Sequence, residues 1–123
     1  MSNNIFTLKD KVIVITGAAG LLGRMHAEAV ASNGGTPILL DINVSGLKDF
    51  SGFLKDKYHA DTEFAEVDIT DEIAVRNASD YISENFFKID GLINNAANNP
   101  TMKSSVKNIS RLENFPLDQW NND

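Results

Sequence analysis

The sequence contains no cysteine, only two histidines and no long hydrophobic run. Without cysteine, a disulfide framework, a thiolate metal site and a cysteine nucleophile are all excluded. Two histidines are too few for a histidine-rich metal site, so we expect no metal. No apolar stretch approaches the ~20 residues that span a bilayer, so we expect no contact with a membrane. The first residues show no basic stretch followed by an apolar core, which predicts no signal peptide and a cytoplasmic protein.

Basic charge is also scarce, because 11 Lys and Arg stand against 17 Asp and Glu, for a net charge of −6. A non-specific nucleic-acid binder needs a basic surface, so we expect no nucleic-acid partner. The length of 123 residues and the 42% hydrophobic content suit one globular domain, 1–123. A bound nucleotide remains open, because backbone dipoles can hold phosphates without cationic side chains.

The most informative segment is a glycine turn at 16–23, with glycines at 17, 20 and 23. It follows the apolar run 12–15, which is typical of a strand covered on both faces, and it opens a helix predicted at 20–32. A strand, a glycine turn and a helix in this order bind the pyrophosphate of a dinucleotide. The helix N-terminus adds free N–H groups and a partial positive charge.

The rest of the chain alternates strands with helices, and each helix places its apolar residues on one face. Further strands are predicted at 36–41, 62–67 and 89–94, and further helices at 45–58 and from 70 or 71 to about 86. The apolar faces comprise Leu22, Met25 and Ala29 in the first helix, Leu47, Phe50, Leu54 and Tyr58 in the second, and Val75, Ala78, Ile82 and Phe86 in the third.

Such alternation implies right-handed crossovers and a parallel sheet. We therefore predict an α/β fold, a doubly wound, Rossmann-like parallel sheet of strand order 3-2-1-4, as the N-terminal half of such a domain. Residues 97–115 are polar and irregular, and 116–123 are predicted as the start of a helix. The edge of the fourth strand would then lack a partner, which predicts a homo-oligomer.

The predicted strand order places a ligand crevice between the first and fourth strands, at their carboxyl ends. Asp41 stands 18 residues after Gly23, where this fingerprint expects an acid that binds the ribose hydroxyls; the alternative is a simple turn residue, which the spacing disfavours. Its carboxylate would repel a 2′-phosphate, which favours NAD over NADP. Asp68 either accepts a hydrogen bond from adenine or opens the third helix. Arg24 is expected to be a solvated surface residue.

Taken together, these residues resemble the short-chain dehydrogenase/reductase family. The resemblance rests on the glycine turn, the two aspartates, the segment Asn94-Asn95-Ala96-Ala97 and Trp120. It implies an NAD-dependent oxidoreductase that transfers a hydride between NAD(H) and an alcohol or carbonyl, with sugars and sugar nucleotides among the candidate substrates. The implied cofactor-binding residues are Thr16, Gly17, Ala19, Gly20, Leu21, Leu22, Gly23, Asp41, Ile42, Asp68, Ile69, Asn95, Ala96 and Ala97.

Two departures from the family pattern limit what the resemblance implies. The glycine spacing is that of the extended branch, and the alanine at 97 replaces a usual glycine.

The family reaction uses a Tyr with a Lys four residues later, whereas Tyr58 and Tyr81 are followed at that distance by Thr62 and Asn85. We therefore expect no catalytic residue here and an inactive, NAD-binding part of an oxidoreductase. The alternatives are a non-catalytic nucleotide-binding module, or an epimerase or dehydratase acting on sugar nucleotides.

Overall fold

The computed structural model describes residues 4–98 and 117–118. Within them, strands and helices alternate along the chain, as the sequence predicts. The elements are β1 (Val12–Thr16), α1 (Leu21–Ser32), β2 (Thr36–Asp41), α2 (Val44–Tyr58), β3 (Glu63–Glu66), α3 (Glu72–Phe86) and β4 (Gly91–Ile93). Leu117 and Asp118 are helical, and the other expectations for 99–116 and 119–123 lie outside the described residues.

The strands form one parallel sheet in the order β3-β2-β1-β4, which confirms the predicted order. Strand β1 lies in the middle and pairs with both β2 and β4, with Ile15 opposite Leu39 on one side and Ile93 on the other. Because all pairs are parallel, the carboxyl ends of the four strands meet at one edge of the sheet. The glycine turn leaves β1 at that edge, directly beside the end of β4.

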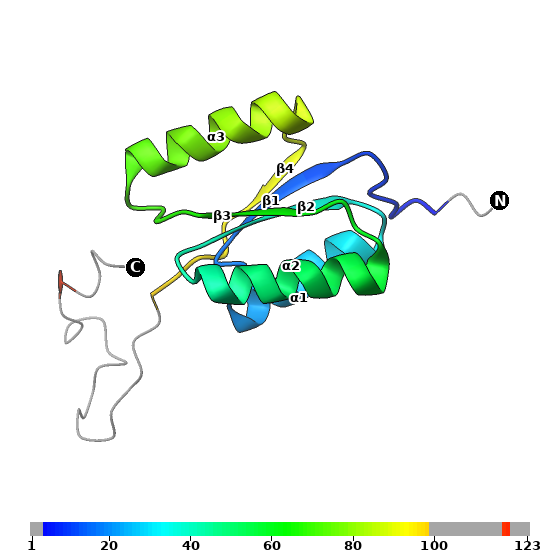
Figure 1. Ribbon diagram of the computed structural model, residues 1–123, viewed down its shortest axis with the longest axis horizontal. Helices are drawn as coiled ribbons and strands as arrows, with labels where there is room; N and C mark the ends of the chain where they lie inside the picture. The colour runs from blue at the N-terminus through cyan, green and yellow to red at the C-terminus, as the bar shows by residue number, and fades with distance from the viewer. Residues whose placement is uncertain (1–3, 99–116, 119–123) are drawn as a thin grey trace, which may run out of the picture.

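The sheet is covered on both faces, with α1 and α2 on one side and α3 on the other (Figure 1). Successive residues of a strand point to opposite faces, so β1 contributes Ile15 to the core beneath α1 and α2 and Val14 to the core beneath α3. Residues of β2 alternate in the same way, with Leu39 in the first core and Leu40 in the second. Burial on both faces explains why these strands are apolar runs.

Helix α1 does not pack through the apolar face that the sequence predicted. Its buried residues are Gly23, Ala27, Val30 and Ala31, whereas Leu22 and Met25 are 60% and 59% exposed. The reason is the close approach of α1 to the end of β1, where a Cβ on Gly23 would press against the Gly17 carbonyl. Small residues therefore face the sheet, and the larger ones turn outward.

The other two helices follow their predicted faces more closely. In α2, Leu47, Phe50 and Leu54 are buried, and in α3 Ala78 and Ile82 are buried. Val75 differs from the prediction, because it is 43% exposed and lines an open apolar groove of about 440 Å³ beneath α3.

Strands β3 and β4 are shorter than predicted, and β4 pairs only from Gly91 to Ile93. The turn before β4 is fixed by Asp90, whose Oδ2 accepts a hydrogen bond from Val12 N at 2.8 Å. This contact lies at the opposite end of β4 from the crevice. In the described residues β4 pairs with β1 alone, and the expected homo-oligomer stays a prediction.

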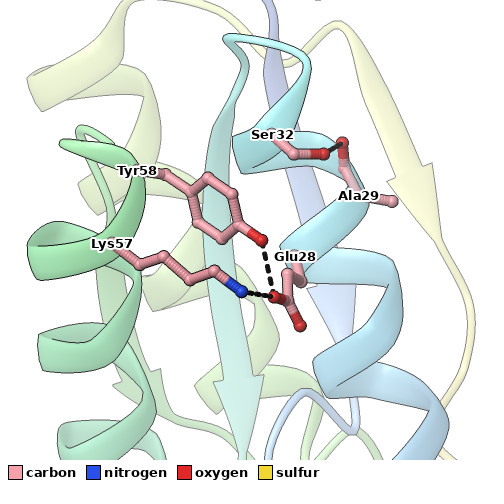
Figure 2. Close-up of polar contacts among 5 residues, drawn as sticks. All are labelled: Glu28, Ala29, Ser32, Lys57 and Tyr58. Carbon is pink, nitrogen blue, oxygen red and sulfur yellow. Dashed lines mark hydrogen bonds and ion pairs between the residues drawn. The ribbon is translucent and has the colours of Figure 1, made fainter.

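Helices α1 and α2 are also joined by a polar cluster near the C-terminal end of α2 (Figure 2). Glu28 Oε1 accepts hydrogen bonds from Tyr58 OH at 2.6 Å and from Lys57 Nζ at 2.9 Å. The hydrogen bonds from Tyr58 and Lys57 lower the pKa of Glu28, and the bond to Glu28 raises the pKa of Lys57. Because α2 starts at the carboxyl edge of the sheet, this cluster lies at the end of α2 that is remote from the glycine turn.

Candidate functional site

The glycine turn has a backbone that leaves no room for side chains at its first glycine. Gly17 has a φ of 65°, in the left-handed region that favours glycine. A Cβ there would lie 2.8 Å from Ala96 Cα and 3.0 Å from the Asn95 side chain. The turn therefore lies directly against the segment that follows β4. Ala18, which follows Gly17 in the turn, donates a hydrogen bond from its N–H to the Leu40 carbonyl at 3.1 Å, and this bond fixes the turn to β2 as well.

Helix α1 differs from its neighbours in how it begins. Asn43 caps α2 and Asp71 caps α3 through side-chain hydrogen bonds, whereas the N-cap of α1 is Gly20, which has no side chain to do so. The first turn of α1 also contains no acidic residue. The N–H groups at a helix start lack partners within the helix, and the helix dipole makes this end partly positive. The start of α1 is therefore suited to hold an anion.

The turn and the end of β4 are joined by the side chains of Thr16 and Asn95, each of which bonds to the backbone of the other segment. Thr16 Oγ1 accepts hydrogen bonds from Asn95 N and Ala96 N, each at 3.0 Å. In return, Asn95 Nδ2 donates to the carbonyl oxygens of Thr16 and Gly17, each at 3.2 Å. The Thr16 hydroxyl is thus engaged within the protein. The sequence placed these residues at one crevice, and the structure shows that they brace its two sides.

Asp41 reaches the glycine turn from the end of β2. Its Oδ2 accepts a hydrogen bond from Ala19 N, and its Oδ1 accepts one from Asn43 N, both at 3.0 Å. Asn43 in turn caps α2 by accepting from Gly46 N at 3.1 Å. The carboxylate therefore stands beside the turn, at the place where the sequence predicted an acid that binds ribose hydroxyls.

Arg24 is the residue whose surroundings the sequence did not foresee. Its Nε donates to the Ala19 carbonyl at 2.9 Å, and its guanidinium carbon lies 5.4 Å from the centre of the Phe50 ring. Arg24 is exposed, as expected, but its side chain lies along the turn and α2 instead of extending into solvent. Its position four residues into α1 carried no signal for these contacts, because they cross from one element to another.

Asp68 follows β3 at the same edge of the sheet and shapes the turn before α3. Its Oδ1 accepts hydrogen bonds from Thr70 Oγ1 at 2.6 Å and Thr70 N at 2.9 Å, and these bonds lower its pKa. The residue that caps α3 is Asp71, whose Oδ1 accepts from Ile73 N at 3.0 Å. Asp68 is thus an exposed carboxylate beside the helix entry and not the cap itself.

Large apolar side chains are exposed along the carboxyl edge of the sheet. The predicted site residues Leu21, Leu22, Ile42 and Ile69 are 77%, 60%, 67% and 47% exposed. They belong to the turn that opens α1 and to the turns after β2 and β3. Apolar side chains gathered at an exposed edge, next to a helix start, are typical of a ligand-binding site.

The two tyrosines lie in different surroundings. The Tyr58 hydroxyl donates a hydrogen bond to Glu28, between α1 and α2, at the end of α2 remote from the turn. Tyr81 lies on α3 and is 46% exposed. Trp120, on which the family resemblance also rests, lies outside the described residues. In the described part of the chain, no group of three or more acidic or histidine side chains could hold a metal, and no helix is long and apolar enough to cross a membrane.

The comparisons with known proteins agree with this geometry. A "CLA biosynthesis dehydrogenase/reductase" from Lactiplantibacillus plantarum is 40% identical over 88 residues, which cover 72% of this chain and 30% of that protein. The crystal structure of an NAD⁺-bound xylitol dehydrogenase matches with a TM-score of 0.69 and 30% identity, over 74% of this chain and 35% of that one. An NADPH-dependent 3-quinuclidinone reductase from Rhodotorula rubra matches with a TM-score of 0.76 and 26% identity, over 98% of this chain and 44% of that one.

The chain therefore spans less than half the length of each of these proteins. These relatives and structural neighbours are dehydrogenases or reductases, and the two solved structures use a nicotinamide dinucleotide. The model of the short chain dehydrogenase family matches residues 11–121, a range that includes strands β1 to β4 and helices α1 to α3 of the described residues. With its 3-2-1-4 sheet and glycine turn, the chain belongs to the short chain dehydrogenase family.

Proposed function

We propose that the chain binds NAD across the carboxyl edge of the sheet, with the pyrophosphate at the start of α1. The observation that carries the proposal is the uncapped start of α1, which has neither a capping side chain nor an acid in its first turn. The glycine turn lets backbone N–H groups approach phosphate oxygens at this point. The residues that would hold the pyrophosphate are Gly17, Ala19, Gly20, Leu21, Leu22 and Gly23, with Thr16 bracing the turn from below.

The remaining predicted residues divide between the two ends of the dinucleotide. Asp41 and Ile42 would bind the adenosine ribose, and Asp68 and Ile69 would flank adenine. Asn95, Ala96 and Ala97 would line the ribose on the nicotinamide side, next to the turn that Asn95 braces.

The preference for NAD over NADP rests on Asp41. Its carboxylate already accepts one N–H on each oxygen, so it is held beside the turn as an acceptor. Such a group suits two ribose hydroxyls, which donate hydrogen bonds, and repels a 2′-phosphate. The NAD⁺-bound xylitol dehydrogenase supports this choice, whereas the NADPH-dependent neighbour shows that the family also accepts the other cofactor.

The reaction we propose for the complete enzyme is hydride transfer between the cofactor and an alcohol or carbonyl, with a sugar alcohol as the substrate class. The likeness to xylitol dehydrogenase supports that class. The bound nicotinamide would supply the hydride acceptor or donor, and the residues described here would bind and orient it. Neither tyrosine of this chain is followed by a lysine at the fourth residue. We therefore propose that the 123-residue chain alone binds NAD without turnover.

Isothermal titration of the purified chain with NAD and with NADP tests this proposal. We expect saturable one-to-one binding of NAD and weaker binding of NADP. An assay of NADH formation with xylitol, followed at 340 nm, should give no rate above the blank. No binding of either dinucleotide would contradict the binding proposal, and measurable turnover would contradict the proposal of inactivity.

A further inference from the structure

Ala19, in the middle of the glycine turn, is held by two charged side chains from opposite directions. Its N–H donates to Asp41 Oδ2 at 3.0 Å, and its carbonyl oxygen accepts from Arg24 Nε at 2.9 Å. The next residue is Gly20, the N-cap of α1, which has no side chain to fix the backbone. The peptide between Ala19 and Gly20 is therefore held at its carbonyl by Arg24 and at its N–H by the turn hydrogen bond from Gly20 N to Gly17 O, whereas Asp41 holds the preceding peptide through Ala19 N.

Arg24 is itself fixed by a second element. Its guanidinium carbon lies 5.4 Å from the centre of the Phe50 ring in α2, and Phe50 is 6% exposed and stacked on Phe53. A planar guanidinium can lie on an aromatic ring while its Nε donates a hydrogen bond in a defined direction. Arg24 thus connects the turn to the buried face of α2.

We propose that Arg24 is a positioning residue, which holds the glycine turn in the conformation that receives the pyrophosphate. The proposal rests on the proposed function, because it assigns to Arg24 a role in the same binding site. Without the Arg24 donor, the peptide between Ala19 and Gly20 keeps only the hydrogen bond from Gly20 N to Gly17 O, and its carbonyl can move more freely. Cofactor binding must then order the turn, which weakens affinity in proportion to the freedom that is lost.

Lys57 of α2 offers a matched control, because it makes the same kind of contact between α1 and α2 at a place far from the glycine turn. Its Nζ donates a hydrogen bond to Glu28 of α1 at 2.9 Å (Figure 2). The same Nζ lies 5.4 Å from the centre of the Phe53 ring. Lys57→Met therefore removes a cation over a ring and a hydrogen bond between α1 and α2, far from the turn. Arg24→Met removes the corresponding contacts beside the turn and keeps an unbranched apolar side chain.

The experiment measures two quantities for the full 123-residue chain and its variants. The first is the hydrogen-exchange rate of the Ala19 and Gly20 amides in the cofactor-free protein, followed by NMR. The second is the Kd for NAD. For Arg24→Met we expect faster exchange at these amides and a Kd raised about threefold to tenfold, the range that one hydrogen bond provides. For Lys57→Met we expect both quantities to stay at the wild-type value.

Arg24→Lys separates positioning from a direct charge contact with the cofactor. Lysine keeps the positive charge but lacks the planar donor, so a positioning role predicts weakened binding in this variant too. Full affinity in Arg24→Lys would overturn the proposal in favour of charge alone. Wild-type exchange rates and Kd in Arg24→Met would overturn it as well. If the wild-type chain fails to bind NAD, the proposed function fails, whereas the exchange rates in the free protein still decide the role of Arg24 in the turn. Circular dichroism checks that each variant is folded. If Arg24→Met does not fold, the milder variant Arg24→Lys decides whether Arg24 positions the turn.

Discussion

Replacing Gly23 with alanine should weaken the fold, whereas the same replacement at Gly52 should strengthen it. Both glycines lie inside helices, so alanine gains about 1 kcal/mol of helix propensity at either position. At Gly52 nothing lies within 4 Å of an added Cβ, so this gain remains. At Gly23 the added Cβ presses against the Gly17 carbonyl and lies 2.8 Å from Ala18 Cα.

The neighbours of Gly23 decide which effect is larger, because all of them are backbone atoms. No side chain can swing aside, so α1 must move away from the end of β1. Overpacking costs about 1–3 kcal/mol, and more where the backbone is forced to move. The cost at Gly23 therefore falls at the upper end of this range, and after the propensity gain of about 1 kcal/mol is subtracted we expect Gly23→Ala to lower the free energy of unfolding by about 2 kcal/mol.

Urea unfolding followed by circular dichroism measures both variants against the wild type. Gly52→Ala should raise the free energy of unfolding by about 0.5–1 kcal/mol. Because the pyrophosphate site moves with α1, Gly23→Ala should also raise the Kd for NAD about tenfold or more, while Gly52→Ala leaves it unchanged. The reasoning would be refuted if Gly23→Ala were as stable as Gly52→Ala and bound NAD equally well.

Three further predictions concern side chains at the two ends of the strands. Asn95→Asp turns a donor into a carboxylate facing the Gly17 carbonyl, so we expect a loss of about 1–3 kcal/mol in urea unfolding, and wild-type stability would contradict the brace. Asp41→Asn removes the charge beside the turn, so competition titration should show NADP binding improved relative to NAD, and an unchanged ratio would contradict the selectivity proposal. The hydrogen bond from Val12 N, followed by that from Lys88, lowers the pKa of Asp90 below its ordinary 3.8. The contribution of Asp90 to stability is therefore present above pH 3.8 and is lost as the pH falls through the lowered pKa. Asp90→Asn should flatten the dependence of the free energy of unfolding on pH below about pH 4. A dependence as steep as that of the wild type would contradict this.

The strand order and the glycine turn could be predicted from the sequence because each rests on local pattern. The apolar run before the glycines indicates a strand buried on both faces, and the alternation of strands with helices allows few topologies. Asp41 was placed by spacing alone, and the structure brings it to within hydrogen-bond distance of Ala19. The roles of these residues toward a cofactor stay predictions.

The packing of α1 could not be predicted, because hydrophobic periodicity weighs large side chains most. Leu22 and Met25 define an apolar face, yet Gly23 and Ala27 face the sheet because the glycine turn brings the helix close to β1. The contacts of Arg24 could not be predicted for a different reason. Its hydrogen bond to Ala19 depends on the exact path of the glycine turn, and its position over Phe50 depends on the distance between α1 and α2, which are not neighbours in sequence.

The most direct test of the account is an NMR titration of the isotope-labelled chain with NAD. The account predicts that amide signals of the glycine turn and of 95–97 shift together and saturate, while signals of Glu28 and Tyr58, at the remote end of α2, stay in place. Signals of Asp41 and Asp68 should shift with the first group if adenosine binds as proposed. Shifts confined to the Glu28 and Tyr58 cluster, or no shifts at all, would contradict binding at the carboxyl edge of the sheet.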